Sequence, residues 1–169
     1  MKRTFLIAGA VVTALASASA TTLEKLTFKE AVKAAESAVV ARALSSSVVS
    51  EEGQTYTETT FEITSAAFGE PGSTVTLRFP GGQLSGTLVP MGEVSAGSPT
   101  FFEGSESLLL IDETDDGSAV VGFNQGIYPV LGNGMVALPR EQGGMMSVSD
   151  AFTVINEART AAEDSPETP

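Results

Sequence analysis

The densest group of side chains that could do chemistry is an acidic segment, Asp112, Glu113, Asp115 and Asp116, followed by Gly117. Ca²⁺ prefers several oxygen ligands from one flexible segment, so this segment suggests a calcium loop. The spacing differs from that of an EF-hand loop, because the glycine of the sharp turn and the final bidentate glutamate are both missing. The simpler interpretation is an Asp-Gly hairpin tip with solvated charges that oppose aggregation of the apolar strand before it. We therefore expect no metal site, and Asp112, Asp115 and Asp116 are the residues with which to test that expectation.

Two other groups of residues are candidates for binding a ligand of unknown identity. Asn124 and Gln125 stand between two apolar runs and could line a pocket. Gly81 and Gly82 could let a ligand approach the backbone closely. Each group also has a structural interpretation, because Asn satisfies backbone groups in turns and such glycines supply positive φ angles or bulges.

The composition excludes several kinds of catalysis. The chain contains no Cys, His or Trp. An imidazole base, a thiolate nucleophile and the usual zinc and copper ligands are therefore absent. Beyond residue 20 the lysines are Lys25, Lys29 and Lys33, whose spacing places them on the solvated side of a helix rather than beside a buried serine. We predict no catalytic residue and no cofactor, and the enzymatic alternative is a hydrolase that uses paired carboxylates.

The charge of the chain argues against two classes of partner. Its formal net charge is −12, from 21 acidic and 9 basic residues. Between Ala43 and Pro139 the only basic residue is Arg78. Nucleic acids and anionic lipid headgroups are bound by basic patches. We therefore predict neither a nucleic-acid partner nor a membrane partner.

The first 20 residues have the features of a signal peptide. Lys2 and Arg3 precede an apolar run from Phe5 to Leu15, and Ala18-Ser19-Ala20 supplies small residues for cleavage. The apolar run is too short for a stable membrane span. We predict export to the periplasm or the medium, with a mature chain that begins near Thr21 and has a net charge of −14 once the two basic residues are removed.

The remaining chain has the size of one domain, which we place at 21–162, before a disordered acidic tail at 163–169. A helix is expected over about Phe28–Ser37, because Thr27 and Glu30 form a capping box before an apolar stripe. Ser147 and Asp150 repeat this pattern ahead of a second amphipathic helix.

Between the helices the pattern predicts strands separated by glycine and proline turns. The expected strands are Ala38–Val49, Thr55–Ser65, Thr74–Phe79, Leu108–Ile111, Ala119–Phe123 and Ile127–Val130, with Met135–Leu138 pairing at an edge. Four consecutive apolar residues at Leu108–Ile111 indicate a strand covered on both faces. Gln83–Pro99 is expected to hold a short strand and a long loop.

The predicted fold class is mainly β, of the α+β type. The best match is a small antiparallel OB-like barrel with an N-terminal and a C-terminal flanking helix. The alternative is an immunoglobulin-like sandwich, although the cysteine pair and the tryptophan of that fold are missing.

Several segments resemble a group of uncharacterised secreted bacterial proteins. The similar segments are 36–43, 61–63, 75–82, 99–110 and 121–126, within a region of roughly Leu23–Val130. More distantly, the order resembles the netrin/TIMP-type OB barrel, in which a run like Phe102-Glu-Gly precedes a buried Leu-rich strand. Inhibitors of that type chelate a catalytic zinc through an N-terminal Cys, whereas Thr21 or Thr22 stands here. The second resemblance therefore implies a fold and not an inhibitory mechanism.

These observations favour a secreted, non-enzymatic binding or accessory module, whose partner is another secreted or envelope protein. The irregular Gln83–Pro99 segment is the expected place for function, because long loops in compact domains are frequently functional. Two alternatives remain open. One is a calcium-dependent or carboxylate-based extracytoplasmic hydrolase, and the other is a self-associating structural protein of the envelope.

Overall fold

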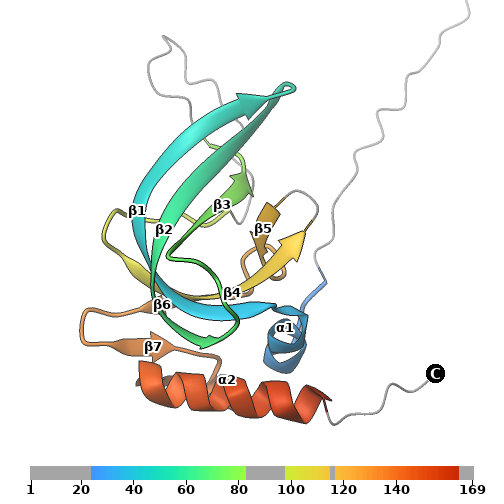
Figure 1. The fold of residues 1–169 in the computed structure, drawn as a ribbon, viewed down its shortest axis with the longest axis vertical. Helices are drawn as coiled ribbons and strands as arrows, with labels where there is room; N and C mark the ends of the chain where they lie inside the picture. Colours follow the sequence, from blue (N-terminus) through green and yellow to red (C-terminus); the bar gives the residue numbers. More distant parts are fainter. Residues whose placement is uncertain (1–23, 83–97, 115–116, 164–169) are drawn as a thin grey trace, which may run out of the picture.

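The computed structural model describes residues 24–82, 98–114 and 117–163, which form one antiparallel β-sheet and two helices (Figure 1). The predicted class, mainly β with flanking helices, is confirmed. The strands are β1 (Ser37–Glu51), β2 (Gln54–Phe68), β3 (Thr74–Pro80), β4 (Glu106–Thr114), β5 (Gly117–Val120), β6 (Ile127–Val130), β7 (Met135–Ala137) and β8 (Met145–Ser147). The predicted signal peptide, residues 83–97 of the predicted loop and residues 164–169 of the predicted tail lie outside the described residues.

The first helix, α1 (Phe28–Ala34), begins where the capping box predicts. The Glu30 backbone N–H donates to Thr27 Oγ1 at 3.3 Å, and the Thr27 backbone N–H donates to Glu30 Oε2 at 2.7 Å. The Thr27 hydroxyl also donates to Glu30 Oε2, at 2.7 Å, and the two hydrogen bonds to this carboxylate, that from the Thr27 backbone first, lower the pKa of Glu30. The helix ends at Ala34 rather than Ser37, because Ala35 has extended backbone angles and Ser37 already belongs to β1.

The sheet is organised by the long β1–β2 hairpin and by β4 beside it. Its strand order is β3-β2-β1-β4-β6-β7-β8, and β5 pairs with β4 off this path. β1 has a register shift at Leu44, between the pairs Ala43–Phe61 and Ser45–Thr60. Such irregularities bend a strand, and β1 and β2 curve strongly along their length (Figure 1).

The sheet remains open, so a closed OB barrel is not confirmed. Within the described residues β3 pairs only with β2, and β8 pairs only with β7. β3 and β5 approach to within 8 Å between Cα atoms but form no ladder. The sandwich alternative needs two sheets, whereas every described strand belongs to a single sheet.

β2 and β4 extend past their predicted bounds, and two further predictions about strands are wrong. β5 ends at Val120 and not at Phe123, because Phe123 has a φ of 67° and Gly122 a φ of 61° in the turn that follows. β7 is not an edge strand, because it pairs with β6 on one side and with β8 on the other. The sequence pattern did not indicate β8, which is only three residues long.

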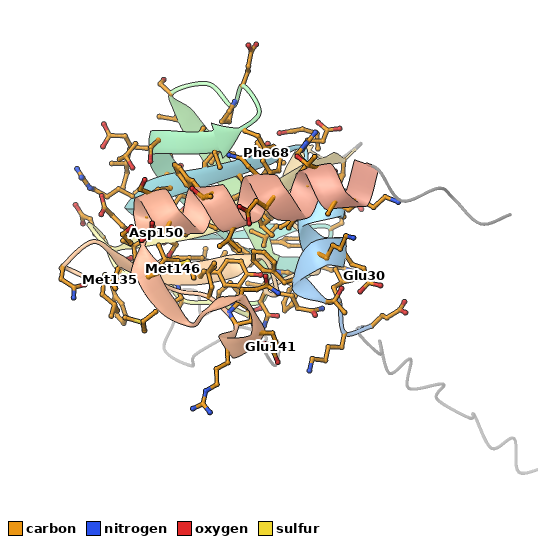
Figure 2. The ribbon with its side chains drawn as sticks, turned by 90° about the horizontal axis from the view of Figure 1, so that it is seen from below. Glu30, Phe68, Met135, Glu141, Met146 and Asp150 are labelled. Atoms are coloured by element: carbon orange, nitrogen blue, oxygen red, sulfur yellow. The ribbon has the colours of Figure 1, made fainter. Side chains whose placement is uncertain are left out.

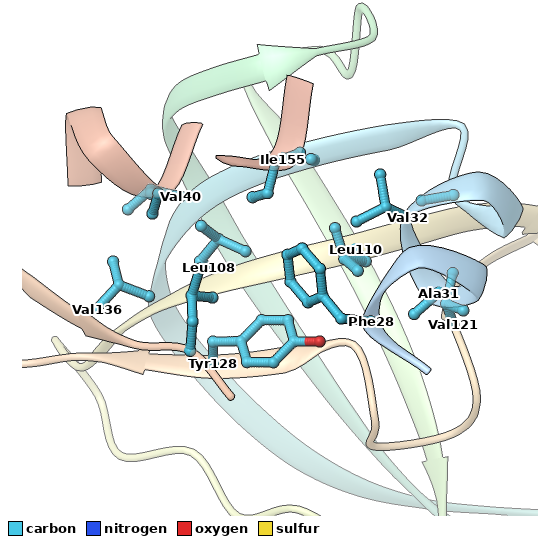
Figure 3. Close-up of a cluster of buried hydrophobic side chains, with 14 residues drawn as sticks. Phe28, Ala31, Val32, Val40, Leu108, Leu110, Val121, Tyr128, Val136 and Ile155 are labelled. Atoms are coloured by element: carbon cyan, nitrogen blue, oxygen red, sulfur yellow. The ribbon is translucent and has the colours of Figure 1, made fainter. Parts of the chain in front are cut away.

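β4 is buried on both faces, as the apolar run predicts. Leu108 and Leu110 belong to a core between the sheet and the helices (Figure 3). Leu109 and Ile111 belong to a second core, inside the bend of the sheet. Their neighbours in this second core include Phe61, Leu77, Phe79 and Val120.

The second helix, α2 (Val148–Glu163), covers the first core. Ser147 caps it, since the Asp150 backbone N–H donates to Ser147 Oγ at 3.1 Å. Ala151 and Ile155 are buried against the sheet. Seen from below, α2 lies across the strands with α1 beside its C-terminal half (Figure 2). Both helices therefore lie at one end of the molecule, and the β1–β2 turn lies at the other (Figure 1).

Candidate functional site

A cleft of about 530 Å³ opens between the β2–β3 surface and the adjoining ends of β4 and β5. We call it the Arg78 cleft. It is lined by Glu51, Tyr56, Arg78, Pro80, Thr114, Gly117, Ser118 and Ala119. These residues come from five strands, so the cleft exists only in the folded chain.

Strand alternation and register bring the charged residues of the cleft together. Leu77 and Phe79 point into the second core, so Arg78 between them points outward. Arg78 stands opposite Glu58 in the β2–β3 register. Glu51, the last residue of β1, reaches the same guanidinium from the hairpin end.

Arg78 is held by two carboxylates and one aromatic ring. Its Nη2 lies 2.6 Å from Glu58 Oε1, and its Nη1 lies 2.6 Å from Glu51 Oε2. The hydrogen bonds that Arg78 donates to Glu58, and then the one that it donates to Glu51, raise the pKa of Arg78 above its ordinary value. Its guanidinium carbon lies 5.0 Å from the centre of the Tyr56 ring, within cation–π distance. The guanidinium therefore stays positively charged and does not serve as an acid or a base.

The hydroxyl groups that line the cleft donate their protons within the protein. Ser118 Oγ donates to Glu113 Oε1 at 2.8 Å. Thr114 Oγ1 donates to the Gly117 carbonyl oxygen at 2.7 Å. The Tyr56 hydroxyl donates to Gln54 Oε1. What these oxygens can still offer to a ligand is acceptor capacity.

The acidic segment that the sequence singled out begins beside this cleft. Asp112 and Glu113 are consecutive residues of β4, so their side chains point to opposite faces of the sheet. The described part of the chain contains no group of three or more Asp and Glu residues that could hold a metal ion. Asp115 and Asp116 lie outside the described residues, so the expectation about a metal site stays a prediction.

Asn124 and Gln125 lie in the turn between β5 and β6 and do not line the Arg78 cleft. The Gln125 side chain accepts from the Leu26 backbone N–H and donates to the Glu24 carbonyl, both at 2.8 Å. It therefore fastens the segment before α1 to the body of the domain. The Asn124 backbone N–H donates to the Gly122 carbonyl at 2.8 Å, as expected for a turn residue.

Gly81 and Gly82 follow directly after Pro80 of the cleft wall. The Gly81 N–H donates to the Thr55 carbonyl at 2.7 Å, and its own carbonyl accepts from Thr57 Oγ1 at 2.8 Å. A Cβ on Gly82 would lie 2.7 Å from Thr57 Oγ1, and its φ of +147° also disfavours side chains. The two glycines therefore pack the end of β3 against the hairpin, as the structural interpretation has it.

The sequence argument did not select Arg78, Tyr56, Glu51 or Ser118 as site residues. One signal was available, because Arg78 is the only basic residue between Ala43 and Pro139 and alternation turns it outward.

Comparisons with known proteins find no match to this chain among family models, curated proteins or solved structures. The resemblance to secreted bacterial proteins and to the netrin/TIMP-type barrel therefore stays a prediction. Among the described residues no helix is long and apolar enough to cross a membrane.

Proposed function

We propose that this chain is a secreted, non-enzymatic binding module that binds another extracytoplasmic protein at the Arg78 cleft. The observation that carries the proposal is the convergence of the last residues of β1 and β4, the first residues of β5 and the β2–β3 surface on one polar cleft. Its volume of about 530 Å³ accommodates several side chains of a partner. Turns held by a sheet are common positions for binding residues.

The order of the strands supports this choice of site. Read as β3-β2-β1-β4-β5, with β3 approaching β5, the sheet corresponds to a partly open OB-like barrel, which we propose as the finer description of the fold. OB folds bind ligands on the surface of strands 2 and 3 and at the loops that join strands 1–2 and 4–5. The Arg78 cleft is lined by residues of β2 and β3 and by the strand ends that flank these two connections, Glu51, Thr114 and Gly117. This correspondence indicates where a ligand binds and not which ligand it is.

The chemistry of the cleft supports binding rather than catalysis. Arg78 keeps its proton, and it already engages one oxygen of Glu51 and one of Glu58. The net charge of −12 disfavours nucleic acid and anionic membranes, which leaves protein as the proposed partner class. The leader-like residues 1–20 support the proposed extracytoplasmic location.

The test is site-specific photo-crosslinking in secreting cells. A photo-reactive amino acid replaces Ala119, which lines the cleft, and in a second strain it replaces Thr153, an exposed residue on the outer side of α2. We expect a defined protein adduct from position 119 and not from position 153. Equal adducts at both positions, or none at position 119, would contradict the proposal, and an adduct with a second copy of the chain would support self-association instead.

A further inference from the structure

Resting on this proposed function, the arrangement of donors and acceptors in the Arg78 cleft identifies the chemistry of the partner. The cleft is lined by the Arg78 guanidinium and the Glu51 carboxylate, and Glu58, beside the cleft, contacts the same guanidinium. Arg78 is therefore more than neutralised, and the local balance of charge is negative. A ligand anion would meet excess negative charge here, whereas a cation would complete the balance.

The hydrogen-bonding groups point in the same direction. Three of the five N–H groups of Arg78, one on each of Nε, Nη1 and Nη2, donate to a carboxylate. The hydroxyls of Tyr56, Thr114 and Ser118 donate to other groups of the protein. Among the described lining side chains, most donors are thus committed, whereas the carboxylate and hydroxyl oxygens retain lone pairs. Such a surface pairs best with a ligand rich in N–H donors.

The size of the cleft and its residue types distinguish between cations. No group of metal-ligating side chains is present among the described residues, so the cleft does not resemble a site for a bare ion. A lysine or arginine side chain brings several N–H donors on a long apolar stem. The stem matches the apolar part of the wall, supplied by Pro80 and Ala119.

We propose that the Arg78 cleft binds a lysine or arginine side chain from an exposed segment of the partner, with Glu51 and Glu58 as its counter-charges. In this arrangement Arg78 is a positioning residue. It holds the two carboxylates, which come from different strands, at one guanidinium, so that their negative charge is gathered at the cleft wall.

The same sheet supplies a matched control. Arg42 on β1 is also flanked by two glutamates, with Nη2 3.0 Å from Glu106 Oε1 and Nη1 3.6 Å from Glu62 Oε2. Neither glutamate lines the Arg78 cleft. The pair Glu62→Gln and Glu106→Gln therefore changes the net charge of the protein by the same amount as Glu51→Gln and Glu58→Gln, away from the cleft.

The experiment is an NMR titration of the purified protein with capped Gly-Lys-Gly-Lys-Gly, and with two peptides in which norleucine or glutamate replaces lysine. We expect the lysine peptide to shift the backbone amides of Tyr56 and Ala119, and E51Q/E58Q to weaken its binding about tenfold or more. E62Q/E106Q should leave its affinity nearly unchanged. Increasing NaCl should weaken the binding of the lysine peptide, whereas it should leave any binding of the norleucine peptide unchanged.

Several outcomes would overturn the inference. The first is that millimolar lysine peptide shifts no backbone amide of the cleft. The second is that the norleucine peptide binds as tightly as the lysine peptide, and the third is that both double variants weaken lysine-peptide binding equally. The first two use the unaltered protein, so they stand even where a variant folds poorly. If the Ala119 adduct persists in E51Q/E58Q, the proposed function holds and the cationic partner is wrong. If Ala119 gives no adduct at all, the proposed function itself fails.

Discussion

Arg42 and Arg78 make the same kind of contact on the sheet, because each pairs with two glutamates. Each guanidinium joins glutamates from two other strands, and the side chains of both arginines are about half exposed, at 47% and 46%. Exposed ion pairs contribute little to stability, because water and salt screen them and long side chains lose freedom. Their main effect is therefore positional, and Arg78, unlike Arg42, is one of the residues that line the Arg78 cleft.

The first prediction separates the role of Arg78 from folding. Arg78→Gln and Arg42→Gln should both leave the urea midpoint nearly unchanged, because each removes exposed ion pairs and Arg78→Gln adds only the loss of one surface cation–π contact. Arg78→Gln should nevertheless abolish the cleft adduct at position 119, whereas Arg42→Gln should retain it. Urea unfolding followed by circular dichroism, run beside the crosslinking, checks both parts. A large drop in midpoint for Arg78→Gln alone would show that this arginine is structural.

The second prediction concerns Tyr128, which packs edge-on against Phe28 with ring centres 5.9 Å apart. Burial raises the pKa of Tyr128 from 10.0 to about 12. The unfolded chain therefore loses this proton at a lower pH than the folded chain, so the stabilisation is complete below pH 10 and is lost as the pH rises to 12. The loss amounts to about 2–3 kcal/mol.

Tyr128→Phe supplies the control for this pH dependence. It removes the ionisable hydroxyl and keeps the ring, so its stability should fall less than that of the unaltered protein between pH 10 and 12. Urea midpoints across this range measure the difference. Parallel curves for the two proteins would show that another group governs alkaline unfolding.

At the scale of the element, β4 determines stability because it belongs to both cores. Leu110 is fully buried against the helices, while Leu44 on β1 is 41% exposed. Our third prediction is that Leu110→Ala costs about 2–5 kcal/mol, from lost transfer energy and a residual cavity. Leu44→Ala, the same chemical change at an exposed position, should lie within about 0.5 kcal/mol of the unaltered protein. Denaturant unfolding checks both, and similar costs would mean that β4 is not central.

The elements that the sequence predicted are those whose signal is local. The Thr27–Glu30 capping box located α1, and the Leu108–Ile111 run indicated a strand buried on both faces. The short β8 carried no such signal, because its three residues form a strand only by pairing with β7. The positive φ of Phe123 likewise depends on the tight turn around it, and glycine is the residue that usually marks such angles.

The candidate site was less predictable than the elements, because it depends on register. Alternation alone turns Arg78 outward, but nothing local indicates that Glu51, 27 residues away, contacts it. That contact requires the β1–β2 turn at its observed position and the β2–β3 register that places Glu58 opposite Arg78. A shift of one residue in either hairpin would turn one partner to the other face. The cleft is therefore a property of the assembled sheet.

At the scale of the whole molecule, the bent sheet separates the helix-covered core from the proposed binding site. Helices α1 and α2 close the core at one end, and the β1–β2 turn that supplies Glu51 lies at the other (Figure 1). The sheet does not close between β3 and β5, and the Arg78 cleft includes residues from both of these strands. The openness that distinguishes this sheet from a closed barrel thus coincides with the proposed binding site.

The last prediction follows from the charge of the whole chain, 21 acidic against 9 basic residues. Raising NaCl from about 10 to 150 mM shortens the Debye length from about 30 to 8 Å. This screens the long-range repulsion among carboxylates as well as the few exposed ion pairs. Because those pairs contribute little, the relief of repulsion should win and the melting temperature should rise. The rise should shrink near pH 4, where many carboxylates are protonated.

Differential scanning calorimetry at the two salt concentrations measures this effect, and a fall in melting temperature with NaCl would show that local ion pairs outweigh the repulsion. The same increase in salt should weaken binding of a lysine peptide at the Arg78 cleft, since that attraction is also electrostatic. Stability and binding should therefore respond to salt in opposite directions. Unfolding would lower the melting temperature and the peptide affinity together. A lower affinity with a higher melting temperature would therefore show that salt weakens the attraction to Glu51 and Glu58 and does not unfold the protein.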